Sequence, residues 1–458
     1  MNINKLIALV LASVSLMGCS AKNVVSNQQQ KVYTNNSAYS AENFGQHHDE
    51  VTLILSFSGG GTRAAALSYG VLEALRDTTI HIAGQDIRLL DEVDMISSVS
   101  GGSFTAAYYG LYGEQTFDNY KETFLYHEVT DDLASLFLSP LRWFSTKTRT
   151  RLAEDYYKNN IFGDKTFADI SRDNSPYIVI NSTDLSTGTR FSFTQGYFDM
   201  LCSDLNSYSI SSAVTASSAV PLLFTPVVIE NRDDCVTQID KDVMFDTSNY
   251  RNRNAVSTIE QYQDKEAVKY VHLVDGGITD NLGLVAVYEM VEYLRLNKSK
   301  SLDPRNNRGQ IKPLIIISVD AATNPELGIA DSIDTPDLKQ TVDAITDIQL
   351  HRYNDSTKDL MIEAMHDWGR LASEKGDDVT PYFVEVSFTK TLDRDKKFLL
   401  NQIRTDFNLS NDNVDLLVDE GYQQLNLDST FQEFIHAHSF DASRSEHSQT
   451  LLTADEEI

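Results

Sequence analysis

The chain has 458 residues, of which 41% are hydrophobic and 10% aromatic, a composition that excludes a wholly disordered protein. Its 66 acidic and 38 basic residues give a net charge of −28, which argues against a nucleic-acid partner because binding phosphates requires a basic surface. The three cysteines, Cys19, Cys202 and Cys235, are too few for a disulfide-dense scaffold or a four-cysteine zinc site.

The N-terminus has the features of an export signal. Lys5 precedes an apolar run from Leu6 to Met17, which is too short to span a bilayer. The run ends in Leu-Met-Gly-Cys, which resembles a bacterial lipobox, whose cysteine is lipidated and becomes the mature N-terminus. We expect residues 1–18 to be a lipoprotein signal peptide and Cys19 to anchor the protein to the bacterial outer membrane, with the domain in the periplasm or at the cell surface. An ordinary signal peptide with an incidental cysteine is the alternative.

The two ends of the mature chain contain few aliphatic residues. Residues 19–48 are rich in Asn, Gln and Ser and predict a flexible tether, and residues 441–458 predict a disordered tail. No Pro/Gly-rich linker divides residues 49–440, so we expect them to form one large domain.

Strands and helices alternate through this domain. Continuous Val, Ile and Leu runs predict buried strands at residues 51–57, 93–99, 177–181, 271–274, 313–319 and 383–388. Helical spacing of apolar residues predicts helices after the first two strands and at residues 336–374 and 413–425. This alternation is typical of an α/β fold with a mostly parallel central sheet covered by helices, here with a helical C-terminal extension.

Ser100 is the first candidate for chemistry. It follows the predicted strand 93–99 and precedes Gly101, Gly102 and a helix, the strand–turn–helix context of a nucleophile elbow. The sharp turn exposes the hydroxyl, and the N-terminus of the helix offers N–H groups to developing negative charge. Ser98 replaces the first glycine of the usual G-x-S-x-G pattern, so a Ser/Gly-rich turn without function is the alternative.

Gly59, Gly60 and Gly61 lie between a predicted strand and a predicted helix. Consecutive glycines there let backbone N–H groups converge on an anion, either a phosphate or an oxyanion. A P-loop is excluded because no Gly-Lys-Ser/Thr follows. The dinucleotide pattern G-x-G-x-x-A matches as far as Ala64, but the next strand ends at Ser100 and not at the acidic residue that this pattern requires, which disfavours nucleotide binding.

Asp275 directly follows the predicted strand 271–274 and precedes two glycines. Open α/β sheets bind their ligands at the C-terminal ends of their strands. A turn aspartate before glycine is the alternative. Since Ser100, the three glycines and Asp275 each follow a strand, their coincidence predicts a single site.

These motifs together resemble those of the patatin-like phospholipases. That family carries D-G-G-G-x-R-G, G-x-S-x-G and D-G-G/A in this order, where the chain has Ser58–Ala64, Ser98–Gly102 and Asp275–Gly277. Residues 181–188 and 216–226 are also similar to family segments, and the resemblance spans about 50 to 290. The departures are at Ser58 for Asp, Ala64 for Gly and Ser98 for Gly.

The resemblance implies a patatin-like hydrolase domain over residues 49–440, with its motif core at 50–290 and a helix-rich part at 330–440. It implies a serine lipid acyl hydrolase of the phospholipase A or lysophospholipase type, acting on a phospholipid or another acyl-ester lipid without a cofactor or metal.

In that mechanism Ser100 forms an acyl-enzyme and Asp275 accepts its proton directly. N–H groups of Gly59 to Gly61 hold the oxyanion, and Arg63 orients this loop or a head group. A solvent-facing charge on the helix is the alternative for Arg63. An acyltransferase with the same dyad and a non-catalytic lipid-binding or assembly lipoprotein are the alternative functions.

Cys202 and Cys235 are the only cysteines besides Cys19. Because an exported protein meets an oxidising compartment, we expect a disulfide between them, with two free buried thiols as the alternative.

A histidine in the site would make a triad in place of the dyad. His272 precedes Asp275 by three positions on one strand, so their side chains are expected on opposite faces. The sequence leaves His351 and His366 open as members of a triad.

Overall fold

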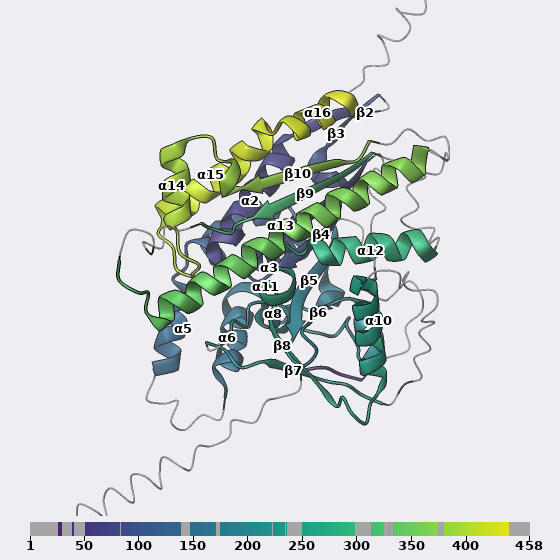
Figure 1. Ribbon diagram of the computed structural model, residues 1–458, viewed down its shortest axis with the longest axis vertical. Coiled ribbons are helices and arrows are strands. Elements are labelled where there is room, and N and C mark those ends of the chain that lie inside the picture. Colours follow the sequence, from purple (N-terminus) through teal and green to yellow (C-terminus); the bar gives the residue numbers. More distant parts are fainter. Residues whose placement is uncertain are drawn as a thin grey trace, which may run out of the picture.

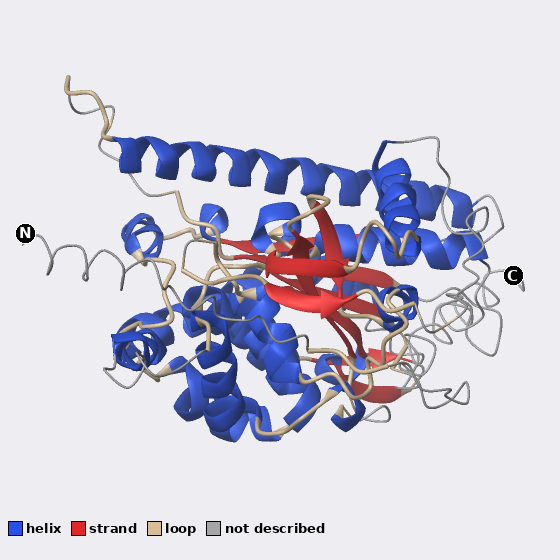
Figure 2. Ribbon diagram, turned by 90° about the horizontal axis from the view of Figure 1, so that it is seen from below, coloured by secondary structure: helices blue, strands red, loops and turns tan. Residues whose placement is uncertain are grey.

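The computed structural model describes residues 26–29, 39–40, 51–82, 84–138, 147–170, 175–221, 223–233, 235, 250–297, 313–324, 329, 333–373 and 380–438. These residues form a central sheet with helices on both sides (Figure 1, Figure 2). The expected α/β fold with a helical C-terminal region is confirmed. Within the described ranges, no helix combines the length and the apolar character needed to cross a membrane.

The main sheet has eight strands among the described residues, in the order β10-β9-β1-β4-β5-β8-β7, with β6 paired to β5. Their bounds are β1 (Thr52–Phe57), β4 (Val93–Val99), β5 (Tyr177–Asp184), β6 (Thr189–Ser192), β7 (Val227–Glu230), β8 (Tyr270–Asp275), β9 (Leu314–Asp320) and β10 (Tyr382–Ser387). A separate hairpin consists of β2 (Thr79–Ile82) and β3 (Gln85–Arg88).

The five strands from β10 to β5 run parallel, and helices on both faces bury them, which is why their sequences are almost continuously apolar. By contrast, β6, β7 and β8 pair antiparallel with their neighbours. The prediction of a mostly parallel sheet is confirmed, and β8 is one of the strands that depart from the parallel direction. Its direction depends on pairing with distant segments, which the local apolar pattern does not report.

The helices surround this sheet. Their bounds are α2 (Thr62–Asp77), α3 (Gly101–Tyr112), α4 (Gln115–Tyr120), α5 (Val129–Leu138), α6 (Arg149–Tyr157), α7 (Gln195–Met200), α8 (Ile210–Ser217), α10 (Tyr250–Gln263), α11 (Gly277–Asp280), α12 (Leu284–Asn297), α13 (Leu338–Ser373), α14 (Arg394–Gln402), α15 (Asn411–Leu427) and α16 (Ser429–His438). Shorter 3-10 or π-helical segments are η2 (Leu89–Glu92), η3 (Lys121–Leu125), η5 (Lys158–Phe162), η6 (Phe167–Asp169) and η7 (Phe388–Lys390).

The C-terminal helices are fixed to the same core as the rest of the fold. The long α13 crosses one face of the sheet (Figure 1), and α15 packs along α2. A Cβ atom at Gly70 would lie 2.0 Å from the Val418 carbonyl oxygen, and one at Gly421 would lie 2.3 Å from that of Leu67. Glycine at both positions therefore permits the two helix backbones to come this close.

Parts of the predicted tether are docked on the fold. Tyr39 is fully buried, and its hydroxyl donates to the Ile178 carbonyl at 2.9 Å. The Asn27 amide donates to the Glu230 carbonyl at 2.8 Å and accepts the Glu230 N–H at 2.9 Å, so it pairs with strand β7. Asn27 and Tyr39 of the predicted tether thus contact the domain, and most of the tether lies outside the described residues.

Candidate active site

Ser100 occupies a strained turn between β4 and α3. Its φ of 48° and ψ of −118° lie in a region that residues with a side chain rarely adopt. The Ser100 N–H donates to the Ser217 hydroxyl at 2.8 Å. This is the backbone geometry of a nucleophile elbow, which turns the serine hydroxyl away from the strand.

Ser100 and Asp275, the two residues predicted for the dyad, are in contact. The Ser100 hydroxyl donates to Oδ2 of Asp275 at 2.9 Å, and only 5% and 8% of the two residues are exposed. Val99 pairs with Asn181 of β5, and Asp275 pairs with Ser182, the next residue of β5. Because β5 continues beyond the end of β4, the antiparallel β8 ends level with the turn that carries Ser100.

The electrostatic environment makes Asp275 a stronger base than an ordinary carboxylate. Burial raises its pKa to about 6. Two hydrogen bonds oppose this rise, from the Gly277 N–H to Oδ1 at 2.7 Å and from the Ser100 hydroxyl to Oδ2. The carboxylate is thus ionised at neutral pH, and its proton affinity is closer to that needed for general-base catalysis near pH 7.

The glycine loop lies against the serine turn. A Cβ atom at Gly59 would lie 3.4 Å from Cβ of Ser100, and one at Gly101 would lie 2.0 Å from the Gly61 carbonyl oxygen. Gly61 has a φ of 63°, and a Cβ atom there would lie 2.4 Å from the carbonyl oxygen of Asp406. Only glycine satisfies both the conformation and the space at this position.

The N–H groups of the loop differ in what they contact. The Gly59 N–H donates to the carbonyl of Asn281 at 3.0 Å, so the expected role of Gly59 as an oxyanion donor is wrong in this geometry. In the described part of the chain, the N–H groups of Gly60, Gly61 and Gly101 make no hydrogen bond. These three groups are therefore the candidates for oxyanion donors.

Arg63 is buried beside the loop, and the alternative of a solvent-facing charge is wrong. Its Nε donates to the carbonyl of Ala321 at 2.9 Å, and one terminal nitrogen donates to that of Ile403 at 2.6 Å. Burial lowers the pKa of Arg63 to about 10, an effect that the charges of Asp320 and Asp347 oppose. Arg63 therefore joins the glycine loop to the ends of β9 and α14.

Three residues that sequence reasoning did not assign to the site hold its backbone. Ser217 accepts the N–H of Ser100 and donates its hydroxyl to the Asn181 carbonyl at 2.6 Å. The Asn181 amide donates to the Ser98 carbonyl at 3.1 Å, and the Asn281 carbonyl holds Gly59. The only available signal for Ser217 and Asn181 was that each lies in a segment similar to the family.

The other predicted residues lie away from the dyad or outside the described residues. Cys202 and Cys235 form a disulfide, with Cα atoms 5.5 Å apart. Cys19 and the signal peptide lie outside the described residues, as does the predicted tail.

The histidines of the described chain make no hydrogen bond to Ser100 or Asp275. The ring of His351 contacts the Thr323 carbonyl at 3.0 Å. His366 is exposed on α13. Neither residue is placed as the middle member of a triad.

Residues 55–288 match the model of the patatin-like phospholipase family, which is just over half of the chain. No curated protein matches the sequence.

Two solved structures are similar at low identity. Human GIVD cytosolic phospholipase A2 in complex with methyl gamma-linolenyl fluorophosphonate is 13% identical over 85% of this chain and 59% of that chain, with a TM-score of 0.40. VipD from Legionella pneumophila is 11% identical over 93% of this chain and 73% of that chain, with a TM-score of 0.31. The chain spans 46% or 59% of the human chains that it matches in these alignments. From the extent of the family match, the chain belongs to the patatin-like phospholipase family.

Proposed function

We propose that the protein is a serine lipid acyl hydrolase of the phospholipase A or lysophospholipase type, acting through an acyl-enzyme on Ser100. The observation that carries this proposal is the buried hydrogen bond from Ser100 to Asp275, made from a strained turn. Membership of the patatin-like phospholipase family supports a lipid acyl ester as the substrate class.

Asp275 is the general base of the first step. As Oγ of Ser100 attacks the ester carbonyl carbon, the carboxylate takes the hydroxyl proton and the carbonyl oxygen becomes an oxyanion. A base with a pKa near 6 accepts this proton more readily than an ordinary carboxylate would. No histidine is needed between the two groups, because they are in direct contact.

The oxyanion is held by backbone N–H groups at the glycine loop and at the start of α3. Gly60, Gly61 and Gly101 are the donors of this kind that have no acceptor among the described residues. Each donor of an oxyanion hole typically contributes about 3–4 kcal/mol to transition-state stabilisation. The N-terminus of α3 adds a favourable dipole to the same side of the reacting carbon.

The second half of the reaction reverses the proton transfer. The protonated Asp275 gives its proton to the leaving alcohol as the ester C–O bond breaks and the acyl group stays on Ser100. A water molecule then gives a proton to Asp275 and attacks the acyl carbon. The bond between this carbon and Oγ of Ser100 breaks, Asp275 returns the proton to Oγ, and the fatty acid is released. An alcohol in place of this water would make the protein an acyltransferase, which the same acyl-enzyme permits.

The test incubates vesicles of bacterial phospholipids with the purified mature protein and follows all lipid products by mass spectrometry. We expect free fatty acid and lysophospholipid from the wild type and none from Ser100→Ala. Ser356→Ala, which removes an exposed hydroxyl on α13, is the matched control and should behave as the wild type. Equal turnover by wild type and Ser100→Ala would overturn the proposal, as would a wild type that changes no lipid. New esters without free fatty acid would identify an acyltransferase.

A further inference from the structure

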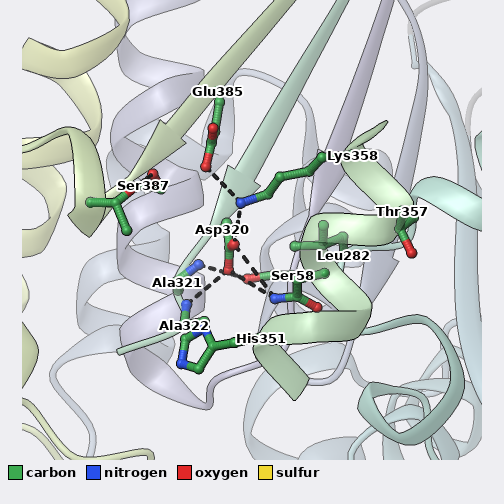
Figure 3. Close-up of polar contacts among 12 residues, drawn as sticks. Ser58, Leu282, Asp320, Ala321, Ala322, His351, Thr357, Lys358, Glu385 and Ser387 are labelled. Atoms are coloured by element: carbon green, nitrogen blue, oxygen red, sulfur yellow. Dashed lines mark hydrogen bonds and ion pairs between the residues drawn. The ribbon is translucent and has the colours of Figure 1, made fainter. Parts of the chain in front are cut away.

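A group of largely buried charges lies toward the C-terminal ends of β9 and β10 (Figure 3). Nζ of Lys358, on α13, donates to Oδ2 of Asp320 at 2.8 Å and to Oε1 of Glu385 at 2.6 Å. The three side chains are only 7% to 18% exposed. Removing charges from water is unfavourable, so such a cluster is weak evidence for stability.

Asp320 fixes the turn that follows β9. Its Oδ1 accepts the N–H of Ala322 at 3.0 Å. This turn contacts the glycine-loop motif through both the N–H and the carbonyl of Ala321. The Ala321 N–H donates to the Ser58 hydroxyl at 2.9 Å, and the Ala321 carbonyl accepts Nε of Arg63 at 2.9 Å.

These contacts reach the oxyanion donors. A Cβ atom at Gly60 would lie 3.6 Å from Cβ of Ala321 and 3.4 Å from a terminal nitrogen of Arg63, so this glycine is packed directly against the turn. The Ser58 carbonyl also accepts the N–H of Gly102 at 3.2 Å, at the start of α3. A shift of the turn would therefore move the glycine loop relative to the serine turn.

The charges near the glycine loop indicate a role for Asp320 in this chain. Ser58 is neutral, whereas the resembling motif has an aspartate at this position. Arg63 donates hydrogen bonds to two neutral carbonyls. The charges of Asp320 and Asp347 favour the ionised form of Arg63, and Asp320 has the larger effect. In this chain the carboxylate beside the loop thus comes from β9, outside the segment that matches the family.

We propose that Asp320 and Lys358 are positioning residues for the oxyanion loop. Lys358 holds the Asp320 carboxylate against the turn, and the turn holds Ser58, Arg63 and Gly60 in the geometry that binds the oxyanion. The helical C-terminal region thereby contributes to catalysis through α13. This inference rests on the proposed function of the dyad.

The test compares kcat and KM on a short-chain ester for three lysine variants, with kcat expressed per active site titrated by a fluorophosphonate. Lys358→Met removes the charge and keeps the length of the side chain, and Lys358→Arg restores the charge. Lys396→Met is the matched control, because Lys396 also joins two carboxylates, those of Asp419 at 3.1 Å and Glu420 at 2.6 Å, but makes no hydrogen bond or ion pair with the glycine loop in the described residues.

We expect Lys358→Met to lower kcat about tenfold or more with little change in KM, because the lost contact acts on the transition state. Lys358→Arg should recover most of this loss, and Lys396→Met should stay within about twofold of the wild type. The pH at which activity appears should not change, since the surroundings of Asp275 are intact.

Two further variants cover the case in which Lys358→Met does not fold. Asp320→Asn has nearly the same shape and should cause the same selective loss in kcat. Ser58→Ala combined with it should lose no more than the deeper single variant, because both interrupt one path of contacts.

Wild-type kcat in folded Lys358→Met or Asp320→Asn would overturn the inference, and so would equal losses in Lys358→Met and Lys396→Met. Full activity of Ser100→Ala in the same assay would instead overturn the proposed function.

Discussion

Ser100 and Asp275 meet because the two strands that carry them run in opposite directions on either side of β5. Val99 and Asp275 pair with Asn181 and Ser182, which are consecutive residues of β5. Ser100 follows the end of one strand and Asp275 is the last residue of the other, and their side chains are joined by a hydrogen bond of 2.9 Å.

The pKa of Asp275 predicts the pH dependence of the reaction. Only the ionised carboxylate can accept the serine proton, so kcat/KM should rise with pH, with its midpoint at about pH 6 and a plateau about one pH unit higher. Well below the midpoint it should fall about tenfold per pH unit, as a single ionisation requires. The measurement is kcat/KM on a neutral ester from pH 4.5 to 9. A midpoint below pH 5 would mean that burial does not act on this carboxylate.

Because the Asp275 carboxylate is buried, we expect its ionisation to destabilise the fold. The pKa of Asp275 is higher in the folded than in the unfolded chain, so its ionisation lowers stability above about pH 6 and has no effect below about pH 4. Asp275→Asn should therefore raise the free energy of unfolding by up to about 3 kcal/mol at pH 8 and by roughly half of that at pH 5. Urea unfolding at the two pH values measures this. An equal gain at both, or a loss at pH 8, would contradict the electrostatic explanation.

Ser217 holds the backbone of the nucleophile, and its loss should impair catalysis more than folding. Ser217→Ala leaves the Ser100 N–H without its acceptor, and a small displacement of the serine should lower kcat roughly 10- to 100-fold. Ser218→Ala is the control, because the Ser218 hydroxyl, just after α8, donates to the Val214 carbonyl of that helix. Steady-state kinetics of both variants test this prediction. Similar kcat values in the two variants would show that Ser217 does not position Ser100.

We propose that Cys19 carries the lipid anchor, on the basis of the Leu-Met-Gly-Cys ending of the signal. Cys19→Ala should abolish metabolic labelling with palmitate and release the protein into the soluble fraction. The fractionation uses cells that express the full chain, with Ser20→Ala as the control. A Cys19→Ala protein that is labelled and stays with the outer membrane would show that the anchor lies elsewhere.

The sequence predicted those features that depend on local patterns. The strand at 93–99 is β4 with the same bounds, and the helix predicted at 413–425 is α15, whose N-cap Ser410 accepts the Asn413 N–H with its hydroxyl. Apolar runs favour buried strands, and a Ser, Thr, Asp or Asn side chain that caps a helix favours a helix start, so both can leave a local record. The residues of the dyad were found for the same reason, since each follows such a run.

The features that depend on distant pairing could not be read in this way. The four-residue strands β6 and β7 are too short for a clear pattern, and the direction of β8 is set by its partner β5. The Gly59 N–H donates to the backbone carbonyl of residue 281. Any residue at that position could supply this carbonyl, so the side-chain sequence does not indicate the contact. Lys358 and Asp320 lie 38 positions apart in the sequence, and the packing of α13 on the sheet brings them into contact.

The most direct test of the dyad is the turnover of histidine and aspartate variants on one short-chain ester. Asp275→Asn should lower kcat by several orders of magnitude in a protein that remains folded. Single changes of His127, His272, His351 and His366 to Ala should each leave most of the activity. A folded histidine variant that loses as much activity as Asp275→Asn would contradict the dyad and establish a triad in its place.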